Sequence, residues 1–313
     1  MSSTESTLST STTASPMMSP TVIDAVVRQS YPAGTLYVVA TPIGNVADIS
    51  LRALHLLSVV DAIACEDTRN TAQLLSRYGI QKPLIAAHQH NEREVAEKIL
   101  MRLQAGERIA LVSDAGTPGV SDPGAKIVDV LKQAGVPVTP LPGASAAISA
   151  LSASGLLSDR FYFVGFLPVK AGQRDTTLRS LLNIPASLIF YEAPHRITET
   201  IAAMLAVFGG DHQVVLAREV SKLFEEIHRC PLSAAPAWLA ADAHREKGEY
   251  VLLLDASQEA TGENDLEARR VLKILLEECS VKQAAHLAAQ LTGLKKNALY
   301  QLALEMKPKE EEE

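Results

Sequence analysis

Short apolar runs alternate along this chain with segments in which apolar residues recur every three or four positions. Strand-length runs that are apolar throughout are typical of buried strands in a parallel sheet, and the helical period is typical of helices that cover one. Between residues 35 and 140 the alternation repeats several times, which predicts an α/β domain with a mostly parallel sheet. The predicted strands are 36–40, 62–65, 84–87, 109–112 and 136–138, and the predicted helices are 49–59, 71–78, 94–104 and 125–133.

A second α/β unit follows an Ala/Ser-rich segment, 143–155, that we expect to be a closely packed helix. Its sheet is expected to be mixed. The predicted strands are 161–164, 187–191, 213–217, 224–228 and 250–254, with helices over 177–182 and 197–208.

The C-terminal part reads as a linker over 256–264 and a helical segment over 266–304. Ser280 followed by Gln283 matches a capping box, and Gly293 separates two short helices. This pattern fits either a helix-turn-helix or a plain helical cap. The fold class is therefore α/β, with two α/β domains and a small C-terminal helical domain. The predicted divisions are a Ser/Thr-rich tail without stable structure over 1–33, domains over 34–155, 156–256 and 265–306, and an acidic tail over 307–313.

Composition narrows the class of protein. The 313 residues carry a net charge of −7, which does not point to nucleic acid, although a local basic face is compatible with it. The chain has three widely spaced cysteines, which argues against a disulfide scaffold and suits a reducing, cytoplasmic location. No apolar run reaches the length of a membrane helix, and the N-terminal residues do not resemble a secretory signal.

Gly/Pro-rich loops follow the predicted strands, where α/β proteins bind their ligands. The loop SDAGTPGVSDPG over 113–124 is the strongest signal, because its glycines and prolines exclude regular structure and leave backbone groups open to a small ligand. The other loops are TPIGN over 41–45, PLPGASA over 140–146, GFLP over 165–168 and YEAPHR over 191–196.

Taken in order with ACEDTR at 64–69, these loops resemble the ribosomal RNA small subunit methyltransferase I family, which is tetrapyrrole-methylase-like (class III). The resemblance runs from about residue 35 to the C-terminal helices. It implies an S-adenosylmethionine-dependent 2′-O-methyltransferase that modifies a cytidine of 16S rRNA near the decoding centre. It also implies a homodimer that acts on the small ribosomal subunit, with the cofactor held between the two α/β domains.

The resemblance also implies roles for single residues. The implied cofactor-binding residues are Pro42, Gly44, Asp114, Ala115, Gly116, Val120, Ser145, Ala146, Glu192 and Ala193. Tetrapyrrole methylases carry GxGxGD after the first strand, whereas this chain has Thr41 to Asn45, which favours the RNA branch over the porphyrin branch.

Charged groups at the strand ends are candidates for catalysis and for RNA binding. Glu66 and Asp67 could accept a proton from the ribose, or Asp67 could simply cap the next helix and pair with Arg69. Asn91 and Glu92 are site candidates by resemblance, while Asn91 also suits a helix cap. The candidate RNA contacts are Arg69, Lys170, Arg174, Arg196, Arg218 and Lys222, with Lys282, Lys295 and Lys296 as possible additions.

The two neighbouring histidines do not indicate a metal site. His88 and His90 lack partners at metal-ligand spacing, and methyl transfer needs no metal, so we expect no metal site.

The sequence supports three hypotheses of function. The main hypothesis is an rRNA methyltransferase. The alternatives are a methyltransferase of the same fold acting on a tetrapyrrole precursor, and an RNA-binding ribosome-assembly factor without catalytic activity.

Overall fold

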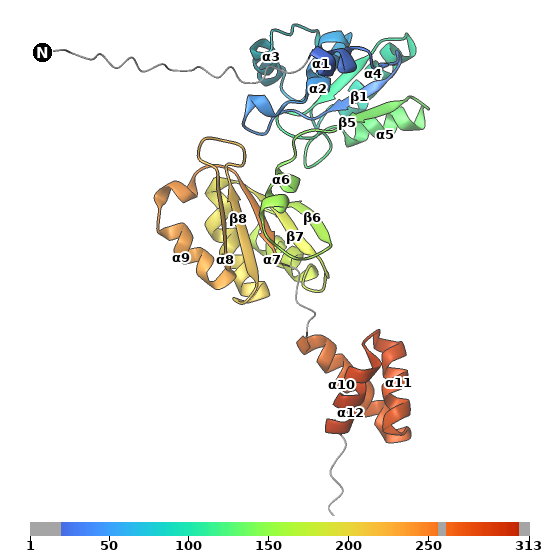
Figure 1. The fold of residues 1–313 in the computed structure, drawn as a ribbon, viewed down its shortest axis with the longest axis vertical. Helices are drawn as coiled ribbons and strands as arrows, with labels where there is room; N and C mark the ends of the chain where they lie inside the picture. Colours follow the sequence, from blue (N-terminus) through green and yellow to red (C-terminus); the bar gives the residue numbers. More distant parts are fainter. Residues whose placement is uncertain (1–19, 256–260, 307–313) are drawn as a thin grey trace, which may run out of the picture. The chain divides into compact units, whose positions relative to one another are not determined.

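The computed structural model describes residues 20–255 and 261–306, whose helices and strands are shown in Figure 1. By its internal contacts the chain divides into two compact units. Of the described residues, the first unit contains those up to Ser149 together with Val220–Leu223. The second contains Ala150–Glu219 and the described residues from Phe224 onward. The predicted divisions of the chain into domains at residues 155 and 256 stay predictions.

The first unit is built on a five-stranded sheet in the order β3-β2-β4-β1-β5, and all its strand pairs are parallel. The apolar runs of the three central strands, β2, β4 and β1, are buried almost throughout, as strands covered on both faces should be, whereas the edge strands β3 and β5 are only partly buried. The strands are β1 (Leu36–Val39), β2 (Ala62–Cys65), β3 (Leu84–Ala86), β4 (Ile109–Val112) and β5 (Val138–Leu141).

Helices cover both faces of this sheet. Leu56 and Leu75, from α2 and α3, belong to the apolar cluster on one face, and Ile99 and Leu131, from α4 and α5, to the cluster on the other. The sheet is therefore doubly wound, as the alternation of apolar runs and helical segments predicts. The helices are α2 (Leu51–Val59), α3 (Thr68–Arg77), α4 (Glu92–Gln104) and α5 (Ala125–Gln133).

Two predictions for this unit need correction. Strand β5 lies at 138–141 and not at 136–138, because Pro140 is accepted in an edge strand, where its missing N–H costs no ladder bond. Residues 20–27 form a helix, α1 (Pro20–Val27), within the tail that we predicted to be without structure. The Tyr31 hydroxyl donates to the Val26 carbonyl at 3.2 Å and so ties the end of α1 to the following loop. The rest of that tail, 1–19, lies outside the described residues.

The second unit holds a mixed sheet in the order β6-β7-β10-β8-β9, in which only β6 and β7 pair in parallel. Side chains of α7, α8 and α9 complete its apolar core on one face. The strands are β6 (Phe161–Phe166), β7 (Ser187–Glu192), β8 (Gln213–Arg218), β9 (Glu226–Pro231) and β10 (Tyr250–Leu254). The helices are α6 (Ala146–Ala153), which spans the division between the units, α7 (Ala171–Ser180), α8 (Ile197–Phe208) and α9 (Ala235–Ala240).

The last three helices, α10 (Thr261–Glu278), α11 (Val281–Thr292) and α12 (Lys296–Met306), share a small apolar core. The capping box at Ser280 and Gln283 is confirmed, and Gly293 ends α11 in a left-handed conformation. Residues 261–264, predicted as linker, already belong to α10, while 256–260 and the acidic tail lie outside the described residues. Among the helices that the structure describes, none is long and apolar enough to cross a membrane.

Candidate active site

The loops after β1 and β4 meet at the centre of the first sheet. These strands are neighbours although they are far apart in sequence, so their carboxyl ends mark the point where the strand order reverses. Ligands of open α/β sheets bind at this point. Thr41 and Gly116 exchange both of their backbone hydrogen bonds, each 2.9 Å long, and the Thr41 hydroxyl donates to the Ser113 carbonyl at 3.0 Å. Pro42 and Gly116, both predicted to bind the cofactor, are thereby brought together.

The loop after β5 joins the same cluster. The Thr117 hydroxyl donates to the Ala144 carbonyl at 3.1 Å, next to Ser145 and Ala146 at the start of α6. Gly116 has a φ of +79°, a conformation that favours glycine, and Gly143 lies so close to Ala40 that an added Cβ would be 2.7 Å from the Ala40 Cβ. The three loops are thus held together through tight backbone contacts.

Glu92 closes the far end of the loop over 113–124. It is buried, accepts from the Gly124 amide at 2.8 Å and pairs with Lys126 at 3.1 Å. Burial alone would raise the pKa of Glu92, but the Gly124 amide and Lys126 together lower it below its ordinary value. Glu92 therefore anchors the loop, and its carboxylate is already occupied by partners within the protein.

Four carboxyl groups lie near the ends of β2 and β4. Asp114 accepts from the Asp67 amide at 3.2 Å and from the Asn70 side chain at 2.7 Å. Burial raises the pKa of Glu66, and Asp114 and Asp67 raise it further. Burial, and next the Glu66 carboxylate, raise the pKa of Asp122 to about 6. Glu66, Asp114 and Asp122 are therefore close enough to interact electrostatically.

Asp67 is different, because it caps α3 and pairs with Arg69 at 2.6 Å. The hydrogen bonds from the Arg69 side chain and amide lower the pKa of Asp67 to about 2. The helix cap and the local ion pair that the sequence suggested for Asp67 are both present, and its catalytic role stays a prediction. A carboxylate with so low a pKa is a weak proton acceptor.

Asn91 occupies the cap position of α4 without a capping hydrogen bond. Its side chain instead accepts from the His88 amide at 2.8 Å and donates to the Ala86 carbonyl at 3.1 Å, which shapes the turn after β3. His88 and His90 are exposed and adjacent. Among the side chains that the structure describes, no three His, Cys, Asp or Glu residues gather as they would around a metal ion.

The short segment 220–223 belongs to the first unit although its neighbours on both sides belong to the second. The Ser221 hydroxyl bonds to the Asn45 amide at 3.1 Å and to Asp48, and the Lys222 side chain lies against Gly44. Ser221, with a φ of +72°, holds a left-handed conformation that is uncommon for a residue other than glycine. Lys222 is thus placed at the TPIGN loop.

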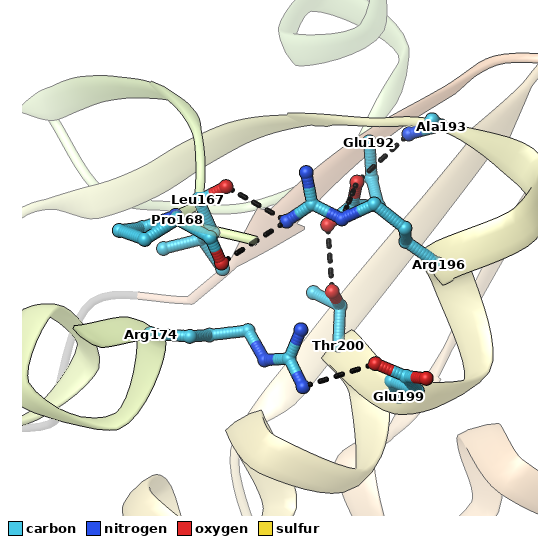
Figure 2. A network of polar contacts seen from close by, with 8 residues as sticks. All are labelled: Leu167, Pro168, Arg174, Glu192, Ala193, Arg196, Glu199 and Thr200. Atoms are coloured by element: carbon cyan, nitrogen blue, oxygen red, sulfur yellow. Dashed lines mark hydrogen bonds and ion pairs between the residues drawn. The ribbon is translucent and has the colours of Figure 1, made fainter. Parts of the chain in front are cut away.

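In the second unit, the loops after β6 and β7 share a network of buried polar groups (Figure 2). The side chain of Glu192, at the end of β7, is fully buried and bonds to the Ala193 amide at 2.8 Å and to the Thr200 hydroxyl at 2.6 Å. Arg196 donates to the carbonyl of Leu167 at 2.7 Å. Glu192 and Ala193, predicted to bind the cofactor, therefore have partners within their own unit.

The predicted RNA contacts fall into three groups. Arg174 and Arg218 are buried: Arg174 pairs with Glu199 at 3.2 Å, and Arg218 donates to the Lys247 carbonyl at 2.7 Å. Arg69 and Lys170 are exposed. Arg196 and Lys222 are half-buried, and Lys282, Lys295 and Lys296 are exposed like Arg69 and Lys170. The exposed groups can reach a phosphate without rearrangement of the described protein.

With this geometry in view, comparison with known proteins identifies the family. A model of the tetrapyrrole (corrin/porphyrin) methylases matches residues 35–236, and a model of the RsmI C-terminal HTH domain matches residues 262–307. The chain is 52% identical over 279 residues to the ribosomal RNA small subunit methyltransferase I of Pseudomonas aeruginosa, covering 88% of this chain and 99% of that protein. The enzyme of the same name from Vibrio cholerae is 51% identical over 272 residues, covering 86% and 94%.

The chain belongs to the ribosomal RNA small subunit methyltransferase I family. Its fold is also similar to solved methyltransferases of low sequence identity. The methyltransferase CobJ, 20% identical, superposes with a TM-score of 0.55 over 72% of this chain and 95% of its own. The cobalt precorrin-4 methyltransferase CbiF, 18% identical, superposes with a TM-score of 0.53 over 72% and 98%. The family resemblance and the fold expected from the sequence are confirmed.

Sequence reasoning did not single out Asp122, which the structure brings into the group of interacting carboxylates with Glu66 and Asp114. It lies within the loop that the Gly/Pro pattern singled out, but its proximity to Glu66 depends on β2 and β4 being neighbours in the sheet. An acidic residue between glycines in a ligand loop was the available signal.

Proposed function

We propose that this protein transfers a methyl group from S-adenosylmethionine to the ribose 2′-oxygen of a cytidine in 16S rRNA near the decoding centre. The methyltransferase family is shown by the curated relatives, whose names specify ribosomal RNA of the small subunit. The main support for a cofactor site comes from three Gly/Pro loops that contact one another at the point where the strand order of the first sheet reverses. We further propose that the protein works in the cytoplasm, where ribosomal subunits are assembled.

The residues of the first unit fit a cofactor of this chemistry. Asp114 offers an exposed carboxylate for an amino group or for ribose hydroxyls, and the half-buried Val120 and Ala146 offer apolar surface for an adenine ring. Pro42 is buried and would act by shaping the TPIGN loop. Gly44, Ala115, Gly116 and Ser145 add backbone close to that surface. When bound, S-adenosylmethionine supplies an electrophilic methyl group to a nucleophilic oxygen. The chain must then orient that oxygen and take up its proton.

Glu66 is the proton acceptor that the structure favours. It is half-buried at the end of β2, and its pKa is raised by burial and by the neighbouring carboxylates, so its basicity exceeds that of an ordinary glutamate. Asp67 is committed to Arg69 and has a pKa of about 2. We therefore assign proton transfer to Glu66 and assign to Asp67, Asn91 and Glu92 the task of holding the loops.

RNA binding requires basic groups that face solvent. Arg69 and Lys170 meet this requirement in the two units, and Lys295 and Lys296 are exposed at the start of α12. The turn at Gly293 separates α11 from α12 as in a helix-turn-helix, whose second helix presents its N-terminal residues to nucleic acid. The lysines supply positive charge to a chain whose net charge is −7.

A homodimer is part of the proposal. Strand β6 lies at the edge of the second sheet and exposes large apolar side chains, which in a monomer favour association. The exposed apolar side chains within the strand are Phe161, Tyr162 and Phe166, and Leu157 and Val169 flank it. Sedimentation of the purified protein would test this: Phe166→Lys should shift a dimer toward the monomer.

The decisive experiment supplies labelled S-adenosylmethionine and small ribosomal subunits that lack the modification. Label in the 2′-O-methylcytidine of digested rRNA is the expected result, and mature subunits that already carry the methyl group are the control. Label found only in a porphyrin precursor would refute the rRNA substrate. Cofactor binding without any transfer would refute catalysis.

A further inference from the structure

Arg196 lies between the ends of two neighbouring parallel strands of the second unit. Its Nη2 donates to the Leu167 carbonyl at 2.7 Å and to the Pro168 carbonyl at 3.3 Å, both in the loop that follows β6. Its Nε lies 3.4 Å from Oε1 of Glu192, the last residue of β7. Figure 2 shows the guanidinium spanning the space between these two loops.

Glu192 holds Arg196 from the other side and is itself fully occupied. Oε1 accepts from the Ala193 amide at 2.8 Å, and Oε2 accepts from the Thr200 hydroxyl at 2.6 Å. The Glu192 side chain is 0% exposed and that of Arg196 is 12% exposed. A carboxylate so enclosed acts on its neighbours within the protein and has no free face for a ligand.

The shape of Arg196 suits this task. A guanidinium is planar and carries five N–H donors in a fixed fork, so a single side chain can satisfy several carbonyls and a carboxylate together. A lysine carries its three donors on one nitrogen and cannot keep the same set of contacts. The Leu167 and Pro168 carbonyls would otherwise lose a partner in a largely buried position, which is costly.

We propose that Arg196, oriented by Glu192, is a positioning residue that joins the loop after β6 to the loop after β7. In this way it fixes the backbone around Ala193, which is a predicted cofactor contact, and it does not contact RNA phosphate. This inference rests on the proposed methyltransferase function. It replaces the role in RNA binding that the sequence suggested for Arg196 and the direct cofactor contact suggested for Glu192.

The test compares Arg196→Lys and Arg196→Met with wild type in the full chain. Cofactor affinity is measured by calorimetry with S-adenosylhomocysteine, and methyl transfer is measured against the concentration of small subunits at several salt concentrations. We expect both variants to lose cofactor affinity by about 10- to 100-fold, the scale on which small displacements of a binding site act. At saturating cofactor, the KM for subunits and its salt dependence should stay at the wild-type values.

Arg179 provides the matched control. It lies in α7 of the same unit, and its exposed side chain pairs with Asp175 one helical turn away. Arg179→Lys and Arg179→Met make the same chemical changes without touching either loop and should leave cofactor affinity unchanged. Glu192→Gln should lose affinity in the same direction as the Arg196 variants. Combining it with Arg196→Met should add little, because both changes break one network.

Other results would overturn the inference. If Arg196→Lys kept its cofactor affinity while the KM for subunits rose in Arg196→Met and its salt dependence weakened, Arg196 would be a phosphate contact. Fully additive losses in the double variant would show that Glu192 and Arg196 act separately. The two claims are tested separately. An absence of methyl transfer in the wild type would refute the proposed function. The positioning role would still be tested by the cofactor affinities from calorimetry, because that measurement needs no RNA.

Discussion

Gly44 offers a direct test of how the segment 220–223 is fitted to the TPIGN loop. A Cβ added at Gly44 would overlap Cγ of Lys222 and lie 3.3 Å from both Cδ and Cε. Cγ is close to the backbone, so the lysine cannot avoid the overlap by moving only its end. The segment is also tied down, because Ser221 bonds to the Asn45 amide and to Asp48.

The size of the effect follows from this overlap. An extra methyl group in a packed site typically costs about 1–3 kcal/mol. If all of this appeared in cofactor binding, Gly44→Ala would weaken the affinity by about 5- to 150-fold. Lys222→Ala removes the three atoms that lie nearest to the new Cβ. The double variant should therefore bind the cofactor with nearly the affinity of Lys222→Ala alone.

Calorimetry with S-adenosylhomocysteine on the four proteins of this cycle measures the coupling, and thermal unfolding reports any general loss of stability. Gly172→Ala is the control, since an added Cβ there meets no atom within 4 Å and Gly172 has an ordinary backbone conformation. The reasoning would be refuted if Lys222→Ala failed to restore affinity to Gly44→Ala. The obstacle would then be the TPIGN backbone or the cofactor itself.

Further predictions concern the rest of the site. Gly143→Ala should weaken cofactor binding in calorimetry, and Ala40→Gly should restore it, because the added Cβ would lie 2.7 Å from the Ala40 Cβ. The pKa of Asp122 is raised to about 6, so the folded protein binds more protons than the unfolded chain between pH 4 and 6, and the free energy of unfolding falls as the pH rises through that range. In urea titrations Asp122→Asn should remove this fall and be more stable than wild type at pH 7; equal stabilities at pH 7 would contradict the assignment. Lys295→Ala with Lys296→Ala should raise the KM for subunits and reduce the salt slope of binding by about 1 per lysine, with cofactor affinity unchanged.

The strands of the first sheet could be predicted because burial on both faces leaves a continuous apolar run in the sequence. The exceptions lie at sheet edges. Strands β5 and β9 contain Pro140 and Pro231, which a reading based on central strands would exclude. Both strands are the last in their sheets, where a missing N–H faces no partner. A sequence does not say which strand is at an edge, so these boundaries were misplaced.

Helix α7 was predicted over 177–182 but spans 171–180. Arg174 is buried one turn before Leu178. A charged residue therefore stands where the helical repeat of apolar residues would place an apolar one, which hid the start of the helix. Helix α9 was missed because its six residues, Ala235–Ala240, are too few to show a helical period. In both cases the packing of the second unit, which is not visible in the local pattern, determines the structure.

The ligand loops could be found because glycine and proline restrict the backbone locally. Their partners could not. Glu92 reaches Gly124 across 32 residues, and Asp114 reaches Asn70 across 44. Each contact exists only because parallel strands bring their carboxyl ends to one edge of the sheet. The loops are therefore a local property of the sequence, whereas the carboxylates that hold them are a property of the topology.

Arginines at strand ends show the same limit for RNA recognition. In sequence, a basic residue after a strand is equally suited to a phosphate and to the carbonyls of a neighbouring loop. The structure separates these uses, because Arg196 and Arg218 donate to backbone carbonyls and are largely buried, and Arg174 is buried beside Glu199. A guanidinium can hold several carbonyls at once, as Arg196 and Arg218 each do, which explains why arginine suits these two positions better than lysine. We therefore expect exposed groups such as Lys170, Lys295 and Lys296 to carry the charge for RNA, and the affinity for the subunit to depend in part on the C-terminal helices.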